Sequence, residues 1–308
     1  MSSINRRDAL RAGMVGLAGA AAAGLSATSS SSAPEMVDQV LAGRVALITG
    51  AARGIGRAIA LAMAEAGADV ACLDICQDIK NHPFPMASSS DLRETIRQVK
   101  ATGQRAIAIE ADVRDYAAMK AAVARTEREL GPLDCLIGNA GIDKPTNIID
   151  NADDDAPWRN VMEVNVLGTA NTLRAALPGM ASRGRGSIVL TASTFGRSGS
   201  SVNPNYAASK WAVVGLMKSA ALQAGPRGVR INAVAPTGVA TGINGPISAA
   251  KRQEYDKFFN DQYHPMDVGM LEPEHITGAV VFLASDAARY VTGTTVDVAA
   301  GANARYTG

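Results

Sequence analysis

The sequence feature that most constrains the fold is a short apolar segment that runs into a glycine-rich turn and then into a helix-like pattern. Residues 44–49 read RVALIT, residues 50–56 read GAARGIG, and apolar side chains recur at helical spacing from 55 to 66. A helix after such a turn directs N–H donors and a positive dipole at bound phosphates. The order strand, turn, helix therefore predicts a dinucleotide-binding unit, and an ordinary strand–helix connection is the alternative.

Each glycine of the turn has a separate expected role. Gly50 allows the sharp bend, Gly54 lets the backbone approach a pyrophosphate, and Gly56 permits close packing of helix on strand. Asp74 ends the next apolar segment, where its carboxylate would accept hydrogen bonds from ribose hydroxyls and repel a 2′-phosphate. This charge favours NAD over NADP, although Arg53 within the turn argues in the opposite direction.

Beyond this unit the chain alternates apolar, strand-like segments with helix-like ones. Further strands are expected at 68–73, 105–110, 133–138, 187–191, 229–234 and 295–298, and further helices at 116–130, 161–177 and 206–223. Short buried strands separated by helices predict an α/β, single-domain Rossmann fold, with a doubly wound parallel sheet of about seven strands and helices on both faces. No Pro- or Gly-rich linker divides residues 40–308, which favours one domain there.

Composition excludes several classes of protein. Apolar residues make up 47% of the chain and charged residues 19%, which rules out a disordered chain. With 30 basic and 29 acidic residues the net charge is +1, so no basic excess points to nucleic acid. No metal is expected, because the histidines lack the spacing of ligands. Buried reduced thiols are expected at the three cysteines, which are Cys72, Cys76 and Cys135.

Residues 1–33 differ from the rest of the chain. Arg6, Arg7 and Arg11 supply a basic start, a weakly apolar run covers 12–25, and small residues follow. This order is that of a signal peptide, and the Arg6–Arg7 pair resembles a twin-arginine signal, which directs the export of folded proteins. The segment therefore predicts a leader that is removed or disordered on a periplasmic or exported protein. An uncleaved leader on a cytoplasmic protein is the alternative.

A group of polar residues follows the glycine turn in the order expected of a catalytic site. Tyr206 and Lys210 lie at i, i+4 on one helical face, so the ammonium should lower the pKa of Tyr206 and make it a general base. Ser193 follows a predicted strand, where its hydroxyl can bond a substrate oxygen. Asn165 stands inside a predicted helix, where asparagine is unfavourable unless it has a buried polar role. An ordinary surface pair is the alternative for Tyr206 and Lys210.

Taken together, these residues resemble the short-chain dehydrogenase/reductase family. The resemblance covers nearly all of 41–300 and rests on TGAARGIG at 49–56, Asp74, NAG at 139–141, Asn165, Ser193, Tyr206 and Lys210. It implies a nicotinamide cofactor, a homotetramer, Tyr206 as general acid/base and Ser193 as donor to the substrate oxygen. It also implies that Lys210 binds the nicotinamide ribose and that Asn165 holds a water in a proton relay.

The resemblance extends the expected cofactor site beyond the glycine turn. The NAG segment would stabilise the sheet beside the cofactor, Asp112 and Val113 would contact adenine, and residues 236–241 would contact the carboxamide, with Thr237 where many members have glycine. For Asp112 a plain helix cap is the competing role. The full expected set is Gly50, Arg53, Gly54, Ile55, Gly56, Asp74, Ile75, Asp112, Val113, Asn139, Ala140, Gly141, Tyr206, Lys210, Pro236, Gly238, Val239 and Thr241.

A narrower resemblance is to the carveol-dehydrogenase-like, mycofactocin-associated subgroup. It rests on LDIC at 73–76 and on a long insert, about 76–91, that contains HPFPM at 82–86. In that subgroup the insert is thought to cover NAD and retain it through turnover, although Gln77 and Asp78 depart from its usual Ala-Pro. A variable surface loop is the alternative. With the leader, this predicts export of a folded, NAD-loaded enzyme that passes hydride equivalents to an external electron carrier.

The expected substrate lid covers residues 241–272. Aromatic residues make up only 4% of the chain, yet several gather in the lid or beside the catalytic residues. Packing within the lid or a subunit interface is the alternative role for about half of them. The expected pocket residues are Phe195, Trp211, Phe258, Phe259, Tyr263 and Met266. An apolar pocket suits a hydrophobic secondary alcohol, such as a cyclic terpenoid or steroid.

The sequence therefore predicts an NAD-dependent alcohol dehydrogenase or ketone reductase. Two alternatives stay open. The first is a non-catalytic NAD-binding sensor or scaffold, against which the intact set Asn165, Ser193, Tyr206 and Lys210 argues. The second is an epimerase or dehydratase on the same fold.

Overall fold

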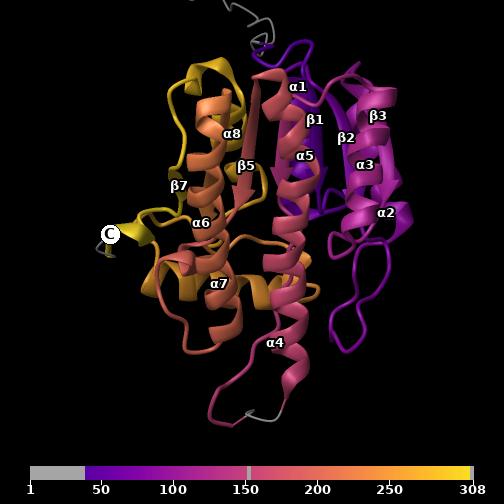
Figure 1. The fold of residues 1–308 in the computed structure, drawn as a ribbon. Coiled ribbons are helices and arrows are strands. Elements are labelled where there is room, and N and C mark those ends of the chain that lie inside the picture. The colour runs from indigo at the N-terminus through magenta and orange to yellow at the C-terminus, as the bar shows by residue number, and fades with distance from the viewer. Residues whose placement is uncertain (1–38, 151–153, 306–308) are drawn as a thin grey trace, which may run out of the picture. The chain divides into compact units, whose positions relative to one another are not determined.

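The computed structural model describes residues 39–150 and 154–305, so the predicted leader at 1–33 lies outside the described residues. A single Rossmann-like domain is built on a parallel sheet of seven strands in the order β3-β2-β1-β4-β5-β6-β7 (Figure 1). The predicted fold class is confirmed. The strands are β1 (Val45–Thr49), β2 (Asp69–Asp74), β3 (Ala106–Glu110), β4 (Cys135–Gly138), β5 (Gly186–Thr191), β6 (Val229–Pro236) and β7 (Thr295–Val298).

The order of the strands determines where a ligand can bind. β1 pairs in parallel with β2 on one side and β4 on the other, so Leu47 lies opposite both Ala71 and Leu136. The chain builds outward from β1 to β3, returns past β1 to β4, and then continues to β7. At such a reversal the connections after β1 and β4 diverge to opposite faces, which leaves a crevice at the carboxyl ends of these strands.

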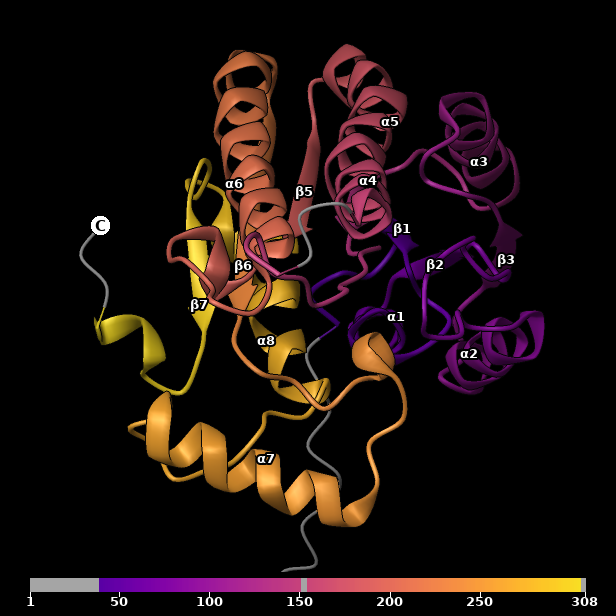
Figure 2. The same cartoon turned by 90° about the horizontal axis from the view of Figure 1, so that it is seen from below.

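The sheet is buried on both faces because successive side chains of a strand point to opposite sides. In β1, Val45 and Leu47 join one apolar cluster, whereas Ala46 and Ile48 join the other. Figure 2 shows a helix layer on each side of the sheet. The first cluster packs under α3 (Tyr116–Glu129), α5 (Thr169–Arg183) and α6 (Pro204–Ala224), and the second under α1 (Gly54–Glu65), α2 (Ser89–Ala101) and α8 (Glu274–Ala284).

Several helices differ from the sequence prediction. α2, α8 and α7 (Ala249–Gln262) are additional to the predicted helices. α2 begins just inside the predicted insert at a capping box, in which Ser88 Oγ accepts from the Asp91 N–H at 3.2 Å and Asp91 Oδ2 accepts from the Ser88 N–H at 2.8 Å. The single helix predicted at 161–177 is instead α4 (Asp155–Met162), a π-helical turn (Glu163–Gly168) and α5.

The segments that can form a site gather at the carboxyl edge of the sheet. In Figure 1 the arrow of β5 points toward the end of the molecule that α7 crosses. The insert after β2 and the loop after β4 extend in the same direction. No helix among the described residues combines the length and apolar character needed to cross a membrane.

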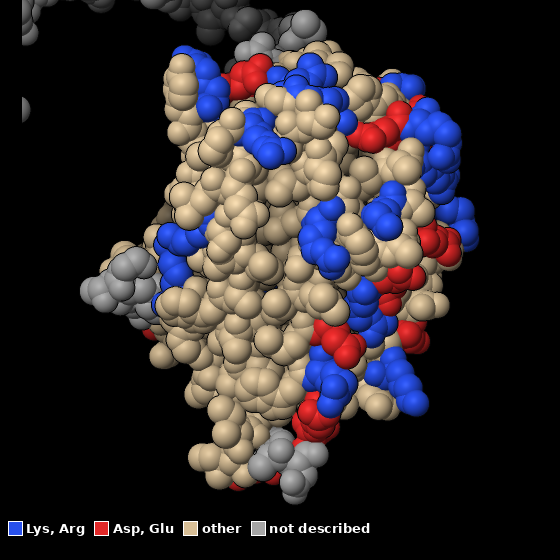
Figure 3. All heavy atoms as spheres, in the orientation of Figure 1, with Lys and Arg blue, Asp and Glu red and all other residues tan. Residues whose placement is uncertain are grey.

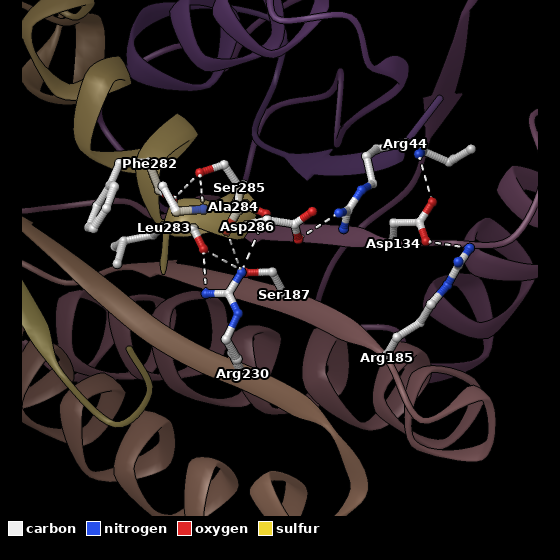
Figure 4. A network of polar contacts seen from close by, with 12 residues as sticks. Arg44, Asp134, Arg185, Ser187, Arg230, Phe282, Leu283, Ala284, Ser285 and Asp286 are labelled. Atoms are coloured by element: carbon white, nitrogen blue, oxygen red, sulfur yellow. Dashed lines mark hydrogen bonds and ion pairs between the residues drawn. The ribbon is translucent and has the colours of Figure 1, made fainter. Parts of the chain in front are cut away.

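Arginine side chains stabilise the opposite, amino edge of the sheet through hydrogen bonds and ion pairs (Figure 4). Arg230 in β6 donates to the carbonyl oxygens of Leu283 and Ser285 at the end of α8, at 2.7 and 3.0 Å. Asp134, just before β4, pairs at 2.9 Å with the more exposed Arg185. These contacts join α8 and the strand starts at a distance from the crevice, so they support the fold rather than the site.

Candidate functional site

The glycine turn between β1 and α1, which we call the cradle, carries no side chains at Gly50, Gly54 and Gly56. Gly50 and Gly54 have φ of +67° and +56°, a left-handed conformation that residues with a Cβ rarely adopt. A Cβ at Gly56 would lie 2.0 Å from the carbonyl oxygen of Gly50, so only glycine fits where α1 leaves the turn. Arg53, the N-cap residue, makes no side-chain cap. The first N–H groups of α1 are therefore available to an anionic ligand.

Asp74 stands at the end of β2 beside this cradle. Its side chain is only 8% exposed, and Oδ2 accepts a hydrogen bond from the backbone N–H of Ala52 at 3.0 Å. Burial raises the pKa of Asp74, while hydrogen bonds from backbone N–H groups, that of Ala52 first, act to lower it. The carboxylate is thus fixed in the wall of the crevice, at the place where an acidic residue can bind ribose hydroxyls.

One cavity extends over the carboxyl ends of β1, β2 and β4. From the insert it is lined by Ile79, Met86 and Ala87. The predicted cofactor residues that line it are Gly50, Arg53, Gly54, Ile55, Gly56, Asp74, Ile75, Asp112, Val113, Asn139, Ala140, Gly141 and Thr241. Those that lie outside its lining are Tyr206, Lys210, Pro236, Gly238 and Val239.

Asp112 lines the cavity but does not cap α3. Its carboxylate pairs with the guanidinium of Arg114 at 2.6 Å. The cap of α3 is Asp115, whose Oδ1 accepts from the Ala117 N–H at 2.8 Å. The helix-cap alternative is therefore wrong for Asp112, whose carboxylate is instead held by an ion pair at the cavity wall.

The NAG segment joins the ends of neighbouring strands. Asn139 Nδ2 donates to the carbonyl oxygens of Thr49 and Gly50 at 3.1 and 3.2 Å, and its Oδ1 accepts from the Thr191 hydroxyl at 3.2 Å. The Thr49 hydroxyl accepts in turn from the N–H groups of Asn139 and Ala140, both at 3.0 Å. The carboxyl ends of β1, β4 and β5 are thus held together directly beside the cradle.

Asn165 lies in the π-helical turn and is 1% exposed. Its Oδ1 accepts from the Ile142 N–H at 2.9 Å, while Nδ2 donates to the Ile142 carbonyl oxygen at 2.9 Å and to Ser209 Oγ at 3.0 Å. Single π-helical turns inside helices are frequent at functional sites. Both amide hydrogens are engaged, so the side chain fixes the loop after β4 against α6. The water-holding role stays a prediction.

Ser193, Tyr206 and Lys210 meet where β5 ends and α6 begins. The side chain of Ser193 lies close enough to the Tyr206 hydroxyl to lower its pKa. The ammonium of Lys210 lies 5.4 Å from the centre of the Tyr206 ring and donates to the Thr191 carbonyl oxygen at 2.8 Å. Ser193 and Lys210 are 8% and 4% exposed, whereas Tyr206 is partly buried.

Burial has the largest effect on the pKa values of Tyr206 and Lys210. Burial raises the pKa of Tyr206 above its usual value, Asp143 raises it further, and the hydrogen bond with Ser193 lowers it. Burial also lowers the pKa of Lys210 to about 8. The sequence predicts that Lys210 lowers the pKa of Tyr206. In the structure burial acts on the Tyr206 pKa in the opposite direction, and the Lys210 ammonium donates to the Thr191 carbonyl oxygen.

Asp143 is a buried acid of this region that the motif-based prediction misses. It lies two residues after Gly141, in the loop after β4, and is 4% exposed. Its Oδ2 accepts from Asn203, the N-cap residue of α6, and from Asn244 of the lid at 3.5 Å. Burial raises the pKa of Asp143 to about 6. The one sequence signal was an acidic residue that closely follows the NAG segment.

Arg53 connects the insert to the lid. Its Nη2 donates to the carbonyl oxygen of Pro85 at 2.9 Å and to that of Gly242 at 3.4 Å. The ring of Phe84 in the insert packs on Gly245 of the lid, 3.0 Å from where a Cβ would stand. The insert therefore packs onto the lid and lines the cavity, which a free surface loop would not do.

The six predicted substrate-pocket residues do not form one group. Phe258, Phe259 and Tyr263 cluster at the end of α7, with ring centres 5.5–5.7 Å apart. A Cβ at Gly238 would lie 2.0 Å from the Phe259 ring, so this ring supports the predicted carboxamide segment. The same ring stacks at 5.2 Å on His264.

The other three predicted pocket residues lie outside that cluster. Trp211 is 53% exposed and donates from Nε1 to the Ser198 carbonyl oxygen at 3.3 Å. Met266 is 60% exposed. Phe195 follows Ser193 closely and donates its backbone N–H to Ser193 Oγ at 3.2 Å. None of the six predicted pocket residues lines the cavity, and the alternative of packing in the lid or a subunit interface fits the three rings of α7 and the exposed Trp211 and Met266.

The cysteines give no sign of metal or disulfide chemistry. Cys72 and Cys135 are buried free thiols, and burial raises the pKa of each to about 12. Cys76 is only partly buried, so the prediction of a buried thiol is wrong there. Within the described ranges, no group of three or more His, Cys, Asp or Glu residues could hold a metal ion.

The fold and the site define a class: a Rossmann-like α/β protein with a glycine cradle and a Ser, Tyr, Lys cluster at the carboxyl edge of its sheet. The family model of the short chain dehydrogenases matches residues 44–252. The chain belongs to the short-chain dehydrogenase family and is an oxidoreductase of that family.

Similar proteins cover nearly the whole chain. A short-chain type dehydrogenase/reductase of Mycolicibacterium smegmatis is 41% identical over 84% of this chain and 96% of its own length. The (-)-trans-carveol dehydrogenase of Rhodococcus erythropolis is 37% identical over 84% of this chain and 97% of its own length. The crystal structure of carveol dehydrogenase from Mycobacterium avium in complex with NAD has a TM-score of 0.79 and 36% identity, and covers 86% of this chain and 99% of that one.

Proposed function

We propose that this protein is an NAD-dependent dehydrogenase that interconverts a hydrophobic, cyclic secondary alcohol and its ketone. The observation that carries the proposal is the cluster of Ser193, Tyr206 and Lys210 at the carboxyl edge, where only β4 separates β5 from the strand that leads into the glycine cradle. The similarity to (-)-trans-carveol dehydrogenase supports a cyclic alcohol as substrate.

In this mechanism each residue of the cluster has one task. The Ser193 hydroxyl and the Tyr206 hydroxyl bind the substrate oxygen, which is possible because Ser193 lies close enough to Tyr206 to influence its pKa. Tyr206 takes the proton from the alcohol, or returns it to the forming alkoxide. Lys210, held by Thr191, supplies positive charge that stabilises the phenolate during transfer. Bound NAD supplies the acceptor or donor of the hydride.

The cavity offers groups for the pyrophosphate and the adenosine ribose of such a cofactor. The cradle of Gly50, Gly54 and Gly56 leaves space and N–H donors for a pyrophosphate, and Asp74 offers a carboxylate to ribose hydroxyls. We infer a preference for NAD over NADP from the Asp74 charge. Arg53 adds little to the opposite preference because its guanidinium is engaged by two backbone carbonyls. The insert that lines the cavity supports retention of NAD through turnover, with an external electron carrier.

Replacing Tyr206 by phenylalanine tests the proposal. Tyr206→Phe removes only the hydroxyl, so we expect loss of hydride transfer with NAD still bound, measured by extraction of the cofactor from the purified protein. Tyr290→Phe is the matched control, because Tyr290 is 89% exposed. The substrate panel consists of cyclic alcohols with an artificial electron acceptor, in case NAD does not exchange. Full activity of Tyr206→Phe would refute the assignment, and an inactive wild type would favour a sensor, an epimerase or a dehydratase.

We also propose that copies of this chain assemble into a homotetramer. Figure 3 shows a broad area with few charged side chains on the face that α5 and α6 form in Figure 1. Exposed apolar side chains on these helices and the turn before α5 include Leu167 at 47%, Trp211 at 53% and Leu222 at 81%. Such a surface is typical of subunit interfaces. Analytical ultracentrifugation tests this: Leu222→Arg should dissociate the assembly, and a monomeric wild type would overturn the proposal.

A twin-arginine leader remains our proposal for residues 1–33. Arg6 and Arg7 form the pair that such an address requires. Fractionation of cells that express the full chain should place the protein, with NAD bound, in the periplasm. Arg6→Lys with Arg7→Lys should keep it in the cytoplasm. Purification of an apo protein from the periplasm would reject export of the loaded enzyme, and an unaltered distribution of the double variant would reject the twin-arginine route.

A further inference from the structure

The ring of His264 is a buried polar group inside the lid. It is 3% exposed and stacks on the Phe259 ring, whose centre lies 5.2 Å away. Each ring nitrogen lies within hydrogen-bond distance of an oxygen. Nδ1 is 2.7 Å from the carbonyl oxygen of Gly269, and Nε2 is 3.2 Å from Thr237 Oγ1. The ring therefore connects the last part of the lid to the segment that follows β6.

The two contacts determine which nitrogen of His264 carries a hydrogen. A carbonyl oxygen can only accept, so Nδ1 donates to Gly269. Burial lowers the pKa of His264 more than the bond to Gly269 raises it, which favours the neutral ring with no hydrogen on Nε2. Nε2 is then the acceptor, and the hydroxyl of Thr237 is the donor. Because the ring is buried, loss of this donor would leave Nε2 unsatisfied.

Thr237 stands where many members of the family have glycine. It is not among the described residues with a positive φ, so the backbone there does not need a glycine. Its N–H donates to the carbonyl oxygen of Val298 at the end of β7, at 3.4 Å, and its hydroxyl faces His264. The departure from glycine therefore adds a hydroxyl through which the segment after β6 is attached to the lid.

The segment after Thr237 leads directly to the wall of the cavity above the cradle. The Ala240 N–H donates to the carbonyl oxygen of Leu271, near the end of the lid, at 2.8 Å. Thr241 then lines the cavity, and its Cγ2 lies 3.2 Å from where a Cβ of Gly54 would stand. A displacement at Thr237 would therefore be transmitted to the contact between Thr241 and the cradle.

We propose that His264 is a positioning residue that couples the lid to the nucleotide site, because it holds the Thr237 hydroxyl and thereby keeps Thr241 against the cradle. His264 does not line the cavity, so it acts through Thr237 rather than by touching a ligand. The inference rests on the proposed function, which places NAD in this cavity. It deepens that function, because it assigns part of the retention of NAD to a hydrogen bond inside the lid.

Three variants isolate this hydrogen bond. Thr237→Val keeps the shape of the side chain and removes the donor, whereas Thr237→Ser keeps the hydroxyl. His264→Asn keeps an amide N–H that can reach the Gly269 carbonyl oxygen, but has no atom at the position of Nε2. The matched control is Thr277→Val, which removes a hydroxyl that donates to the Glu274 carbonyl oxygen at 2.8 Å in α8.

The first measurement is the rate at which bound NAD exchanges with labelled NAD in the loaded protein. We expect Thr237→Val and His264→Asn to raise this rate about three- to tenfold, as expected for the loss of one buried hydrogen bond. Thr237→Ser and Thr277→Val should behave like the wild type. His264→Asn should have a smaller effect in the Thr237→Val protein than in the wild type, because the bond is already absent there. A merely structural role for His264 would give the same fold-change in both backgrounds, which would overturn the inference.

The second measurement is amide hydrogen exchange in the protein without nucleotide, followed in peptides that cover 237–242 and 264–272. Thr237→Val and His264→Asn should each speed up exchange in both peptides, because the N–H groups of Ala240 and Leu271 pair these two segments. This result would support the coupling even if the wild type bound no NAD, an outcome that would count against the proposed function alone. Unchanged exchange in Thr237→Val would overturn the coupling, and unchanged release from a protein that does bind NAD would overturn the role in retention.

Discussion

The side chain of Asn165 gives the sharpest test of how the site is assembled. Replacing it by alanine removes hydrogen bonds to the N–H and the carbonyl oxygen of Ile142 and to the Ser209 hydroxyl. Ile142 is 5% exposed, so water cannot replace the lost partners. An unsatisfied buried backbone group costs about 1–3 kcal/mol, so two such groups lower the free energy of unfolding by about 2–6 kcal/mol in Asn165→Ala.

Asn171 provides a matched control in α5. It is 2% exposed, and its Nδ2 donates to the carbonyl oxygens of Val113 and Arg114 at 3.1 and 2.9 Å. We expect Asn171→Ala to lower the free energy of unfolding by a similar amount in urea. Only Asn165→Ala should also lower kcat, because Ser209 Oγ links the Asn165 amide to the Tyr206 carbonyl oxygen at 2.7 Å.

Two results would refute this reasoning about Asn165. The first is an Asn165→Ala protein whose free energy of unfolding changes by less than about 1 kcal/mol, which would mean that Ile142 finds other partners. The second is an equal fall of kcat in both variants, which would mean that general loosening of the domain, rather than the position of α6, limits turnover.

Three further predictions concern the cradle, the lysine and the amino edge. Arg230→Met removes the charged donor from the last carbonyls of α8, so we expect the free energy of unfolding in urea to fall by about 2–3 kcal/mol. For the exposed Arg185→Met it should fall by less than about 1 kcal/mol, and equal losses in the two variants would contradict this reasoning. Gly56→Ala places a Cβ 2.0 Å from the Gly50 carbonyl oxygen, so nucleotide binding in titration calorimetry should fall at least tenfold, and an unchanged affinity would show that the cradle relaxes. Because the pKa of Lys210 is lowered from 10.5 to about 8, the unfolded chain binds more protons between these values. The free energy of unfolding should therefore rise with pH across this window more steeply in the wild type than in Lys210→Met, and identical slopes would show that the ammonium is not desolvated.

The central strands of the sheet could be predicted from the sequence because they are buried on both faces. A strand such as Val45–Thr49 is a nearly continuous apolar run that the next glycine ends, whereas β7 at the edge is only partly buried and contains Asp297. α7 gave no comparable signal, because none of its side chains is fully buried. α2 does carry a local signal, the capping box of Ser88 and Asp91, which lies within the predicted insert at about 76–91.

The parts of the site also differ in how far the sequence predicts them. Gly50, Gly54 and Gly56 are set by local backbone geometry, so their spacing along the chain already predicts the cradle. The π-helical turn at Asn165 and the enclosure of Asp143 depend on contacts with distant segments. Neither has a spacing pattern of its own, and a lone acidic residue in a loop does not show which walls will surround it.

The guanidinium of Arg53 has a kinetic consequence. Because it donates to both Pro85 and Gly242, the insert and the lid lose a shared contact whenever either one moves away. We expect the two segments to open together, with a common opening rate for the amide hydrogens on both sides. In the proposed dehydrogenase, entry of the alcohol and departure of the nucleotide would then share one timescale.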